Sequence, residues 1–381
     1  MIIDDFNKQV LKHIQGNSGT FWYWQGRVAL YAILKAMKIK KGDEVIVPAY
    51  TCVVVPNAII YLGAKPVYVD VDPTTYNMDP LRVEQTISPK TKVIICQNTY
   101  GLSSNVEHIL DLAKKHNLYT VEDCTHGFGG TYKGKPNGSY CDAAFYSTQW
   151  NKPFSTGLGG FAVTNNDQIK QGLQDQESKK AAPSFKDRLM LKVLYFFRNN
   201  IINDVTYWPM IKLYRWLSKN NLVLGSSKGQ EIEDVKMPEA YFKDFCGTQV
   251  KEGLKNIKNL ETLLIRRKHN AEIYTTFLSL KGKNHVDKKL FSDHSFLKYP
   301  LLVKNRDKFL KLAEANKISL GDWFISPLHP VHNNDWSKWF FEPSKYPASM
   351  RLSAMVVNLP TDIQDVKKVI SFLEENIEEV V

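Results

Sequence analysis

The sequence predicts an α/β protein with a large, doubly wound, mostly parallel sheet and a smaller C-terminal α+β domain. Between Gly26 and Asp123, short apolar runs typical of buried strands alternate with segments whose apolar residues recur at helical spacing. This alternation is typical of strand–helix–strand units with parallel strands. The chain has 381 residues, of which 43% are hydrophobic, enough for one large domain and a smaller one.

The first half of the chain supplies the elements of this sheet in order. A helix is predicted over Gly26–Met37, where apolar residues at helical spacing follow a glycine. The next predicted elements are strands at Val45–Pro48, Pro66–Val71, Lys92–Gln97 and Leu118–Glu122, with helices at Val53–Leu62 and His108–His116. Ligands of open α/β sheets bind at the carboxyl ends of the strands, so we expect the functional site there.

The second half predicts the smaller domain. From Thr248 to Leu278, good helix formers carry apolar residues at three-to-four spacing, which predicts one long helix. The elements predicted beyond it are strands at His294–Val303 and Ile318–Trp323, and helices at Phe309–Asn316 and Asp362–Glu378.

Composition and charge argue against several classes of protein. The five cysteines are scattered without metal-ligand spacing, so we expect free thiols and no metal site. The N-terminus has early acidic residues and no long apolar core, and no apolar run approaches the ~20 residues of a membrane span. We therefore expect a cytoplasmic protein. The net charge of +11 is spread along the chain without a nucleic-acid-binding motif. It favours an anionic small substrate or an acidic membrane surface, or serves solubility alone.

The stretch Asp142–Gly160, DAAFYSTQWNKPFSTGLGG, carries the most reactive candidate. Lys152 lies between Trp150, Asn151, Pro153 and Phe154, and a Gly-rich turn follows it. Apolar neighbours desolvate an amine, which lowers its pKa and leaves more of it free to attack a carbonyl. An ordinary surface lysine on a loop is the alternative that this stretch leaves open.

Two further candidates flank the predicted sheet. Asp123 ends a buried strand, where an acid is costly unless it pairs with a cation such as a protonated cofactor ring. A helix N-cap or a structural salt bridge is the commoner role for such a residue. The helix that starts near Gly26 offers free N–H groups to an anion, and Arg27 would add positive charge unless it is merely solvated.

Taken together, these stretches resemble the sugar aminotransferase family of DegT/StrS type, pyridoxal-phosphate enzymes of fold type I. The matching stretches are GDEVIVPAYT, LGAKPVYVDVD, ISPKTKVII, the Tyr100-Gly101 turn, VEDCTHGFG, YKGKPNG, DAAFYST..NK, GLGGFAVTN, SPLHP and VVNLPTD. The resemblance is nearly continuous from Gly26 to Asn165 and resumes more weakly from about Tyr241. It implies a large pyridoxal-phosphate-binding domain over 1–255 and a small domain over 256–381.

The resemblance implies the central roles residue by residue. Lys152 matches the lysine that forms the Schiff base with pyridoxal phosphate. Asp123 matches the acid that pairs with the pyridinium nitrogen and keeps it protonated. Ser147 matches the serine that hydrogen-bonds the cofactor phosphate.

The resemblance also places five residues around the cofactor. Gly26 and Arg27 match a Gly-Thr pair whose backbone N–H groups face the same phosphate. His126 stands near the position of the ring hydroxyl, where many members have Gln. Tyr100 and His329 are expected on the substrate side of the cleft, with a structural role as the alternative for His329.

Three residues depart from the family pattern. Arg27 replaces a small residue, and its guanidinium could bind the phosphate directly. Cys52 stands where members often have an aromatic that stacks on the cofactor ring. Phe242 stands where an Asn from the partner subunit reaches the phosphate, so we expect that contact to be lost and Arg27 to compensate.

The segment 178–225 is longer than the family usually has and predicts an atypical helical insertion. Apolar and aromatic residues such as Phe196 and Trp216 fall among basic residues such as Arg188 and Lys212. Residues 184–225 therefore fit helices that dock peripherally on an acidic membrane. They equally fit helices that pack on the domain or across a dimer interface, the commoner use of such stripes.

We therefore expect a homodimeric, pyridoxal-phosphate-dependent aminotransferase that moves an amino group from glutamate to a nucleotide-linked keto-sugar. The product would serve surface polysaccharide or amino-sugar biosynthesis. A sugar dehydratase of the same family would replace the lysine by His, so Lys152 argues against it. A nicotinamide oxidoreductase is excluded because no GxGxxG opens a helix after the first strand. A non-catalytic, membrane-associated binding protein is the remaining alternative, which Cys52 and Phe242 leave open.

Overall fold

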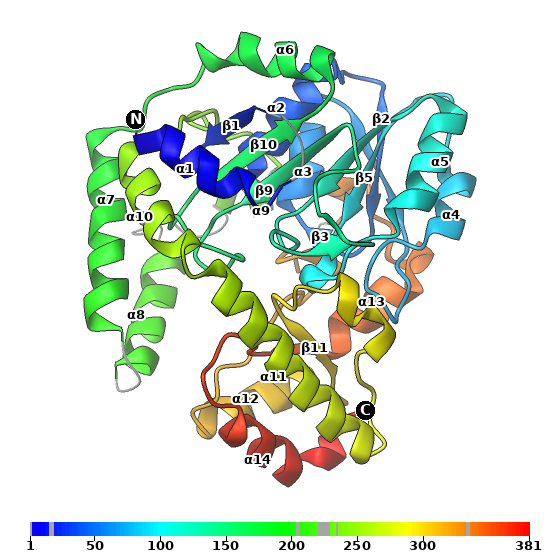
Figure 1. The fold of residues 1–381 in the computed structure, drawn as a ribbon. Helices are drawn as coiled ribbons and strands as arrows, with labels where there is room; N and C mark the ends of the chain where they lie inside the picture. Colours follow the sequence, from blue (N-terminus) through cyan, green and yellow to red (C-terminus); the bar gives the residue numbers. More distant parts are fainter. Residues whose placement is uncertain (1, 15–18, 203–205, 220–228, 234, 333–335) are drawn as a thin grey trace.

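The computed structural model of the chain describes residues 2–14, 19–202, 206–219, 229–233, 235–332 and 336–381 (Figure 1). The strands of its main sheet are β1 (Thr20–Tyr23), β2 (Glu44–Pro48), β4 (Lys65–Val69), β5 (Thr91–Gln97), β6 (Tyr119–Asp123), β9 (Ala143–Ser147) and β10 (Gly160–Thr164). Within the described residues they form one sheet of seven strands in the order β1-β10-β9-β6-β5-β2-β4.

The main sheet is mostly parallel. Strands β4, β2, β5, β6 and β9 pair in parallel, while β10 is antiparallel to β9 and β1 is antiparallel to β10. The predicted α/β architecture is confirmed, and the four predicted strands of this sheet correspond to β2, β4, β5 and β6 to within two residues at each end. The carboxyl ends of β5, β6 and β9 therefore lie at one edge of the sheet, where Asp123 and Ser147 end their strands.

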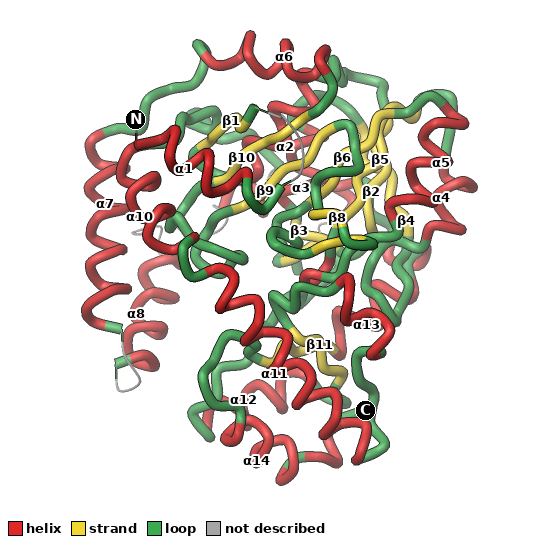
Figure 2. The backbone as a smooth tube through the Cα atoms, in the orientation of Figure 1, coloured by secondary structure: helices red, strands yellow, loops and turns green. Residues whose placement is uncertain are grey.

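Helices surround this sheet (Figures 1 and 2). Helix α2 lies against β9 and β10, and α4 and α5 lie together beside β4 and β5. The helices of the large domain are α1 (Ile2–Leu11), α2 (Gly26–Ala36), α3 (Val54–Ile60), α4 (Pro80–Thr86), α5 (Val106–His116), α6 (Asp167–Glu177), α9 (Gly229–Glu233) and α10 (Gly247–Ile257). The helices predicted at Gly26, Val53 and His108 are thus present as α2, α3 and α5.

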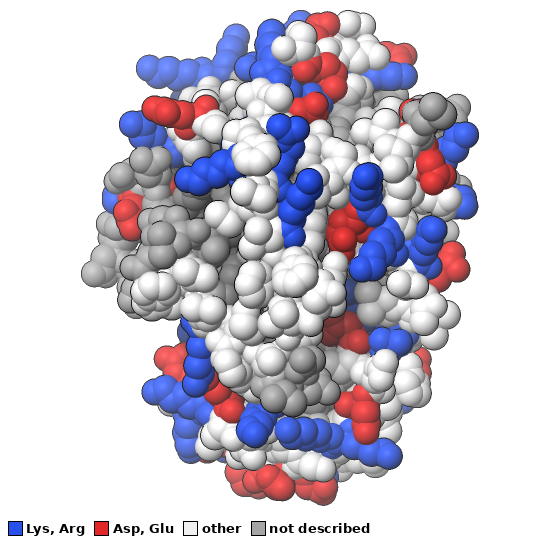
Figure 3. All heavy atoms as spheres, turned by 90° about the vertical axis from the view of Figure 1, so that its left-hand side faces the viewer, with Lys and Arg blue, Asp and Glu red and all other residues white. Residues whose placement is uncertain are grey.

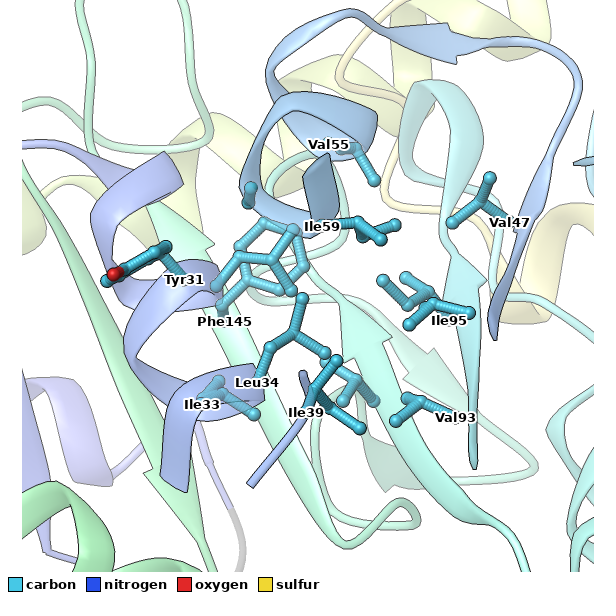
Figure 4. Close-up of a cluster of buried hydrophobic side chains, with 14 of the residues drawn as sticks. Tyr31, Ile33, Leu34, Ile39, Val47, Val55, Ile59, Val93, Ile95 and Phe145 are labelled. Atoms are coloured by element: carbon cyan, nitrogen blue, oxygen red, sulfur yellow. The ribbon is translucent and has the colours of Figure 1, made fainter. Parts of the chain in front are cut away.

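The largest hydrophobic cluster joins α2 and α3 to the sheet (Figure 4). Every residue of α2 from Gly26 to Leu34 is buried, so this helix is covered on all sides. Ile33 and Leu34 pack in the same cluster as Val93, Ile95 and Phe145 of the strands. Each fully buried side chain of this size contributes roughly 1.5–3 kcal/mol relative to an exposed one. The N-terminus of α2 is thereby held firmly at the carboxyl edge of the sheet.

The chain passes to the small domain through two helices, where the sequence predicted one. The helix predicted over Thr248–Leu278 is interrupted at Lys258 and Asn259, and α11 (Leu260–Leu280) begins after the break. Helix α10 packs on α1, whereas α11 runs away from the sheet to the small domain (Figure 1). Periodicity alone does not show the interruption, because apolar residues continue on both sides of it.

The small domain contains α11 with β11 (Tyr299–Leu302), α12 (Arg306–Ala315), α13 (Pro347–Met355), β13 (Val356–Leu359) and α14 (Lys367–Glu375). Strands β11 and β13 pair antiparallel. The strand predicted over Ile318–Trp323 is wrong, since Gly321 forms only an isolated bridge to Asn358 and Trp323 N–H donates to the Asn358 side chain at 2.9 Å. The other two elements are shorter than predicted: β11 begins only at Tyr299, and α14 begins at Lys367, whose N–H donates to the Asp365 side chain.

After the small domain begins, the chain returns once to the large core. Residues 328–341 contribute Leu328, Val331 and Trp339 to the same hydrophobic cluster as α2. Strand β12 (Leu328–His329) pairs in parallel with β3 (Thr51–Cys52), which sets His329 beside Cys52. The two short strands β7 (Thr131–Tyr132) and β8 (Lys135–Pro136) form a separate hairpin.

The predicted insertion forms a helical hairpin at the side of the large domain (Figure 1). We call α7 (Phe185–Phe196), the π-helical segment Phe197–Ile201 and α8 (Tyr207–Lys219) the α7–α8 hairpin. Residues 203–205 and 220–225 of the predicted insertion lie outside the described residues. Leu191 and Tyr195 of α7 are buried against Trp24 and Leu158. Along the described part of the chain, no helix is both long and apolar enough to cross a membrane.

Candidate active site

A cavity of about 480 Å³ opens at the carboxyl edge of the main sheet. This volume lies within the roughly 300–1,000 Å³ of ligand-binding pockets. The predicted site residues that line it are Gly26, Arg27, Cys52, Asp123, His126, Ser147, Lys152 and His329. These residues are as far apart as 303 positions in sequence, yet the fold brings them around one space.

Asp123 supplies a buried acid to the cavity. Only 3% of the residue is exposed, and burial raises the pKa of its carboxyl above the ordinary value. Its Oδ1 accepts a hydrogen bond from the Thr125 N–H at 2.9 Å. Among the described residues, no Lys or Arg forms an ion pair with this carboxylate. A cationic group of a ligand would therefore be strongly favoured beside it.

Lys152 supplies a nucleophilic amine to the same cavity. Burial lowers the pKa of this amine to about 8, although the nearby Cys52 and Asp123 partly oppose the shift. Its Nζ lies 4.5 Å from the centre of the Trp323 ring. A larger fraction of the amine is therefore neutral near pH 7 to 8 than for an exposed lysine, as attack on a carbonyl requires.

An aromatic stack that the sequence did not reveal holds His126 in place. The Trp323 and His126 rings are parallel to within 3°, with centroids 4.9 Å apart. The Tyr100 N–H donates to His126 Nδ1 at 3.2 Å, which leaves Nε2 as the protonated ring nitrogen. Burial, followed by the charge of Lys152, lowers the pKa of His126 well below its usual value. His126 is therefore a neutral hydrogen-bond donor at this edge of the cavity.

Ser147 and the start of α2 form an anion site. The helix has 11 residues, and its N-cap residue Gln25 makes no side-chain capping bond. A Cβ at Gly26 would lie 2.8 Å from the Ser147 Cβ, so only glycine lets the helix N-terminus approach this serine so closely. Backbone N–H groups at a helix N-terminus and a serine hydroxyl together favour a phosphate group.

Arg27 is buried and paired inside the protein. Its Nη1 forms a salt bridge with Glu231 Oε2 at 2.6 Å, and both side chains are at most 7% exposed. Glu231 belongs to α9, and its backbone carbonyl accepts from Asn57 Nδ2. The guanidinium was predicted to bind the phosphate in place of lost contacts; the structure instead shows a protein carboxylate as a partner of this side chain.

Four other predicted residues have different surroundings. Tyr100 was predicted to contact substrate, but it is 1% exposed, outside the described cavity lining, and its hydroxyl donates to the Trp323 carbonyl at 2.6 Å. Phe242 packs against Tyr23 and Tyr31 in the large core. Cys52 and His329 face the cavity, and burial lowers the pKa of His329 to about 4.

The opposite wall of the cavity comes from the α7–α8 hairpin. Sequence reasoning placed these helices on a membrane, on the domain or at a dimer interface, and did not connect them to the site. The hairpin residues that line the cavity include Met190, Val193, Leu194, Phe197, Met210, Leu213 and Leu217. The signal available in the sequence was the pair of apolar stripes, but it did not show what they would face.

The donor set fits one particular kind of cofactor. Asp123 suits a cationic ring nitrogen, Lys152 a carbonyl carbon, and His126 an oxyanion on the ring. The α2 N-terminus with Ser147 suits a phosphate. Together they fit a flat, phosphorylated heteroaromatic aldehyde.

Comparison with protein families gives a match over most of the chain. The sequence model of the DegT/DnrJ/EryC1/StrS aminotransferase family matches residues 3–182 and 248–373. The gap between the two matched ranges contains the α7–α8 hairpin.

Curated relatives match the chain to different extents. GDP-perosamine synthase of Escherichia coli O157:H7 is 46% identical over 141 residues, which cover 37% of this chain and 39% of that enzyme. A GDP-perosamine synthase of Caulobacter vibrioides is 44% identical, again over 39% of its own length. The uncharacterized protein MJ1066 of Methanocaldococcus jannaschii is 28% identical over 358 residues, covering 90% of this chain and 83% of that protein.

Solved structures share the whole fold. DesV of S. venezuelae superposes with a TM-score of 0.76 at 19% identity, covering 100% of this chain and 90% of that one. NtdA of Bacillus subtilis, solved with bound cofactor PMP, gives a TM-score of 0.73 at 22% identity over 99% of this chain and 77% of that one. These likenesses show the fold type, with its large sheet domain and small C-terminal domain.

Proposed function

Because the chain belongs to the DegT/DnrJ/EryC1/StrS aminotransferase family, we propose that it is a pyridoxal-phosphate-dependent aminotransferase acting on a keto-sugar linked to a nucleotide. Glutamate is the proposed amino donor. The observation that carries the proposal is the meeting of Lys152, Asp123 and the α2 N-terminus in one cavity. The relatives named as GDP-perosamine synthases support a sugar acceptor.

Pyridoxal phosphate, when bound, supplies an aldehyde that reacts with amines and a ring that accepts electrons. Lys152 would hold it covalently through the side-chain amine. Asp123 would face the ring nitrogen and keep it protonated, because a buried carboxylate favours a nearby cation. His126 would donate to the ring hydroxyl, and Ser147 with the α2 N-terminus would bind the phosphate.

Once the amino donor has displaced it, the freed Lys152 amine acts on protons. Its pKa of about 8 lets it accept a proton from the donor α-carbon and return one as a general acid near neutral pH. The Trp323 ring beside Nζ limits the amine's freedom and excludes water from one side. The same residue performs the reverse proton transfers when the amine passes to the sugar ketone.

The site argues against the two related alternatives. A dehydratase that uses His in place of the lysine does not fit, because Lys152 is present and lines the cavity. A non-catalytic binding protein has no need for a desolvated amine and an unpaired buried acid around one space. Both groups are costly to bury and serve catalysis directly.

The test is the absorbance spectrum of the purified protein with added pyridoxal phosphate. We expect a band that depends on Lys152 and changes when glutamate is added. The matched control is Lys298→Ala, since Lys298 is a second buried lysine over the same Trp323 ring, 5.8 Å from its centre. Lys298→Ala should keep the band, and Lys152→Ala should lose it while keeping its circular dichroism spectrum.

The proposal is overturned if the wild-type protein shows no band or if Lys152→Ala shows the same one. A band that responds to another amino acid but not to glutamate overturns only the donor assignment. Amination of GDP-, UDP- and dTDP-linked keto-sugars, compared by mass spectrometry, then identifies the nucleotide.

Two finer proposals concern the surroundings of the enzyme. We propose a homodimer, as the family resemblance implies, to be tested by light scattering. We also propose that the outer face of α7 contacts an anionic membrane surface in the cytoplasm. Phe185, Leu189 and Phe196 are 73%, 49% and 58% exposed there, and Lys186, Arg188 and Lys192 are exposed beside them. Leu189→Asp should then weaken sedimentation with anionic vesicles.

A further inference from the structure

The cavity has a polar wall and an apolar wall that differ in origin. The polar wall is made by strand ends and carries Asp123, Ser147 and Lys152. The apolar wall is made by the α7–α8 hairpin. Apart from Arg198, the described hairpin residues that line the cavity are all apolar, including Met190, Leu194, Met210 and Leu217.

The apolar wall is attached to the loop that carries the amine. The Tyr195 hydroxyl donates to the Thr156 carbonyl at 2.5 Å. The Tyr195 ring packs edge-on against Trp150, which lies two residues before Lys152. Buried Leu191 fixes the middle of α7 to the large domain. The wall is therefore a built part of the site with a fixed position relative to the reacting group.

The cavity-facing residues of the hairpin remain open to solvent in part. Val193 is 43% exposed and Leu213 is 46% exposed, although both line the cavity. The face of the molecule that carries the hairpin shows a broad uncharged area in its middle, with Lys and Arg side chains gathered beside it (Figure 3). Apolar side chains around a cavity gain by covering an apolar group, because that removes both surfaces from water.

We propose that this wall binds a long apolar chain carried by the acceptor, so that the substrate is an amphiphilic keto-sugar. This inference rests on the proposed function and names its substrate class more closely. The chain is either an acyl group on the sugar or a prenyl group on its phosphates. The polar wall then holds the sugar at Lys152, and the chain extends along α7 and α8.

A purely polar carrier fits this wall poorly. A nucleotide presents hydroxyls, ring nitrogens and phosphates, each of which loses water on entering the cavity and needs a hydrogen-bond partner there. The aliphatic and aromatic side chains of the wall supply none. An apolar chain loses no hydrogen bonds and gains with each methylene covered.

The experiment measures binding of two amphiphiles to the pyridoxal-phosphate-loaded protein by isothermal titration calorimetry. Decyl β-D-glucoside, kept below its micelle concentration, carries the chain on a sugar. Geranyl diphosphate carries it on phosphates. Glucose and inorganic diphosphate are the chain-free controls, and we expect each to bind at least about tenfold more weakly than its chain-bearing counterpart.

The matched variants lie one turn apart on the same helix. Val193→Asp places a charge in the apolar wall, and Leu189→Asp places it on a residue of α7 that is 49% exposed and outside the described cavity lining. We expect Val193→Asp to weaken binding of an amphiphile at least about tenfold and Leu189→Asp less than about twofold. Leu213→Asp, on α8, should behave like Val193→Asp.

Binding of either amphiphile with this pattern supports the proposal, and the tighter of the two identifies where the chain is attached. Absence of chain-dependent binding overturns it, and so does an equal loss in Val193→Asp and Leu189→Asp. Loss of binding as the protein dimerises would show that a second copy covers the wall, which also overturns it. The Lys152-dependent absorbance band is unaffected by these outcomes, so failure here leaves the proposed function intact.

Discussion

The two walls of the cavity differ in how they are held and in what they can do. The strand-end wall is part of the main sheet, and Asp123 and His126 in it are 3% and 4% exposed. The hairpin wall is joined to the domain mainly by Leu191 and Tyr195, and many of its other side chains are 37% or more exposed. A rigid sheet edge suits groups that must keep fixed distances, whereas an added hairpin suits recognition.

The difference also shows how the enzyme can vary without losing its chemistry. The family match is interrupted at residues 183–247, which contain the hairpin, while the strand-end residues all lie within the matched ranges. Changes in the hairpin alter what the cavity accepts and leave the reacting groups in place. The following predictions test this division of roles, from the largest expected effect to the smallest.

The largest effect should come from the strand-end wall. Asp123→Asn removes the carboxylate that would pair with the ring cation, and loss of a buried charge partner costs 2–5 kcal/mol, so the transamination rate should fall on the order of 10³-fold. The control is Glu122→Gln, since the Glu122 carboxylate accepts from Asn98 Nδ2 and Gly138 N–H at 2.8 Å, away from the cavity. A loss of less than about tenfold in Asp123→Asn would contradict the assigned role.

Arg27 tests whether the start of α2 is held by protein or by ligand. Arg27→Met should leave Glu231 buried without its partner and lower the free energy of unfolding by about 3–5 kcal/mol. The double variant Arg27→Met/Glu231→Met should recover most of that loss. Denaturant unfolding without cofactor measures both. If stability hardly changes and affinity for pyridoxal phosphate falls instead, Arg27 is a phosphate ligand.

The attachment of the hairpin should depend on Leu191. Leu191→Ala removes a fully buried side chain and should cost about 2–3 kcal/mol of unfolding free energy, making α7 more sensitive to limited proteolysis. Leu189→Ala, on the exposed side of the same helix, should change stability by less than about 0.5 kcal/mol. The Lys152-dependent band should survive in both variants, and its loss in Leu191→Ala would show that the two walls are not separable.

The pKa of Lys152 predicts the pH dependence of cofactor capture. Only the neutral amine attacks the aldehyde, so the capture rate should rise about tenfold per pH unit below pH 8 and level off above it. Stopped-flow absorbance over pH 6 to 10 measures the midpoint. A midpoint near that of an exposed lysine would show that the amine is not desolvated in solution.

The smallest effect should come from the ion pair between the hairpin and the small domain. Lys212 Nζ lies 3.7 Å from Glu314 Oε1 of α12, and the side chains are 70% and 43% exposed. Lys212→Ala should change the free energy of unfolding by less than about 0.5 kcal/mol, because water screens such pairs. A larger change would indicate that the small domain helps to hold the hairpin.

Much of the strand-end wall could be predicted from the sequence. The strands are apolar runs bounded by turns, so Asp123 and Ser147 were located at strand ends by short-range pattern alone. Lys152 was singled out by its immediate neighbours. Tyr100 was predicted at the wrong place, because its backbone turn lies at the site while its side chain points into the aromatic cluster behind it.

The sequence by itself determined which residues carry the chemistry and which strands bring them to one edge, because strand periodicity and strand-end positions are local properties. Only the tertiary structure decided what those residues contact. Trp323 lies 197 positions from His126, Arg27 pairs with a carboxylate 204 positions away, and the hairpin meets a cavity built mostly from other parts of the chain. Such contacts depend on the packing of whole elements, and no local pattern encodes which distant surface an apolar stripe will cover.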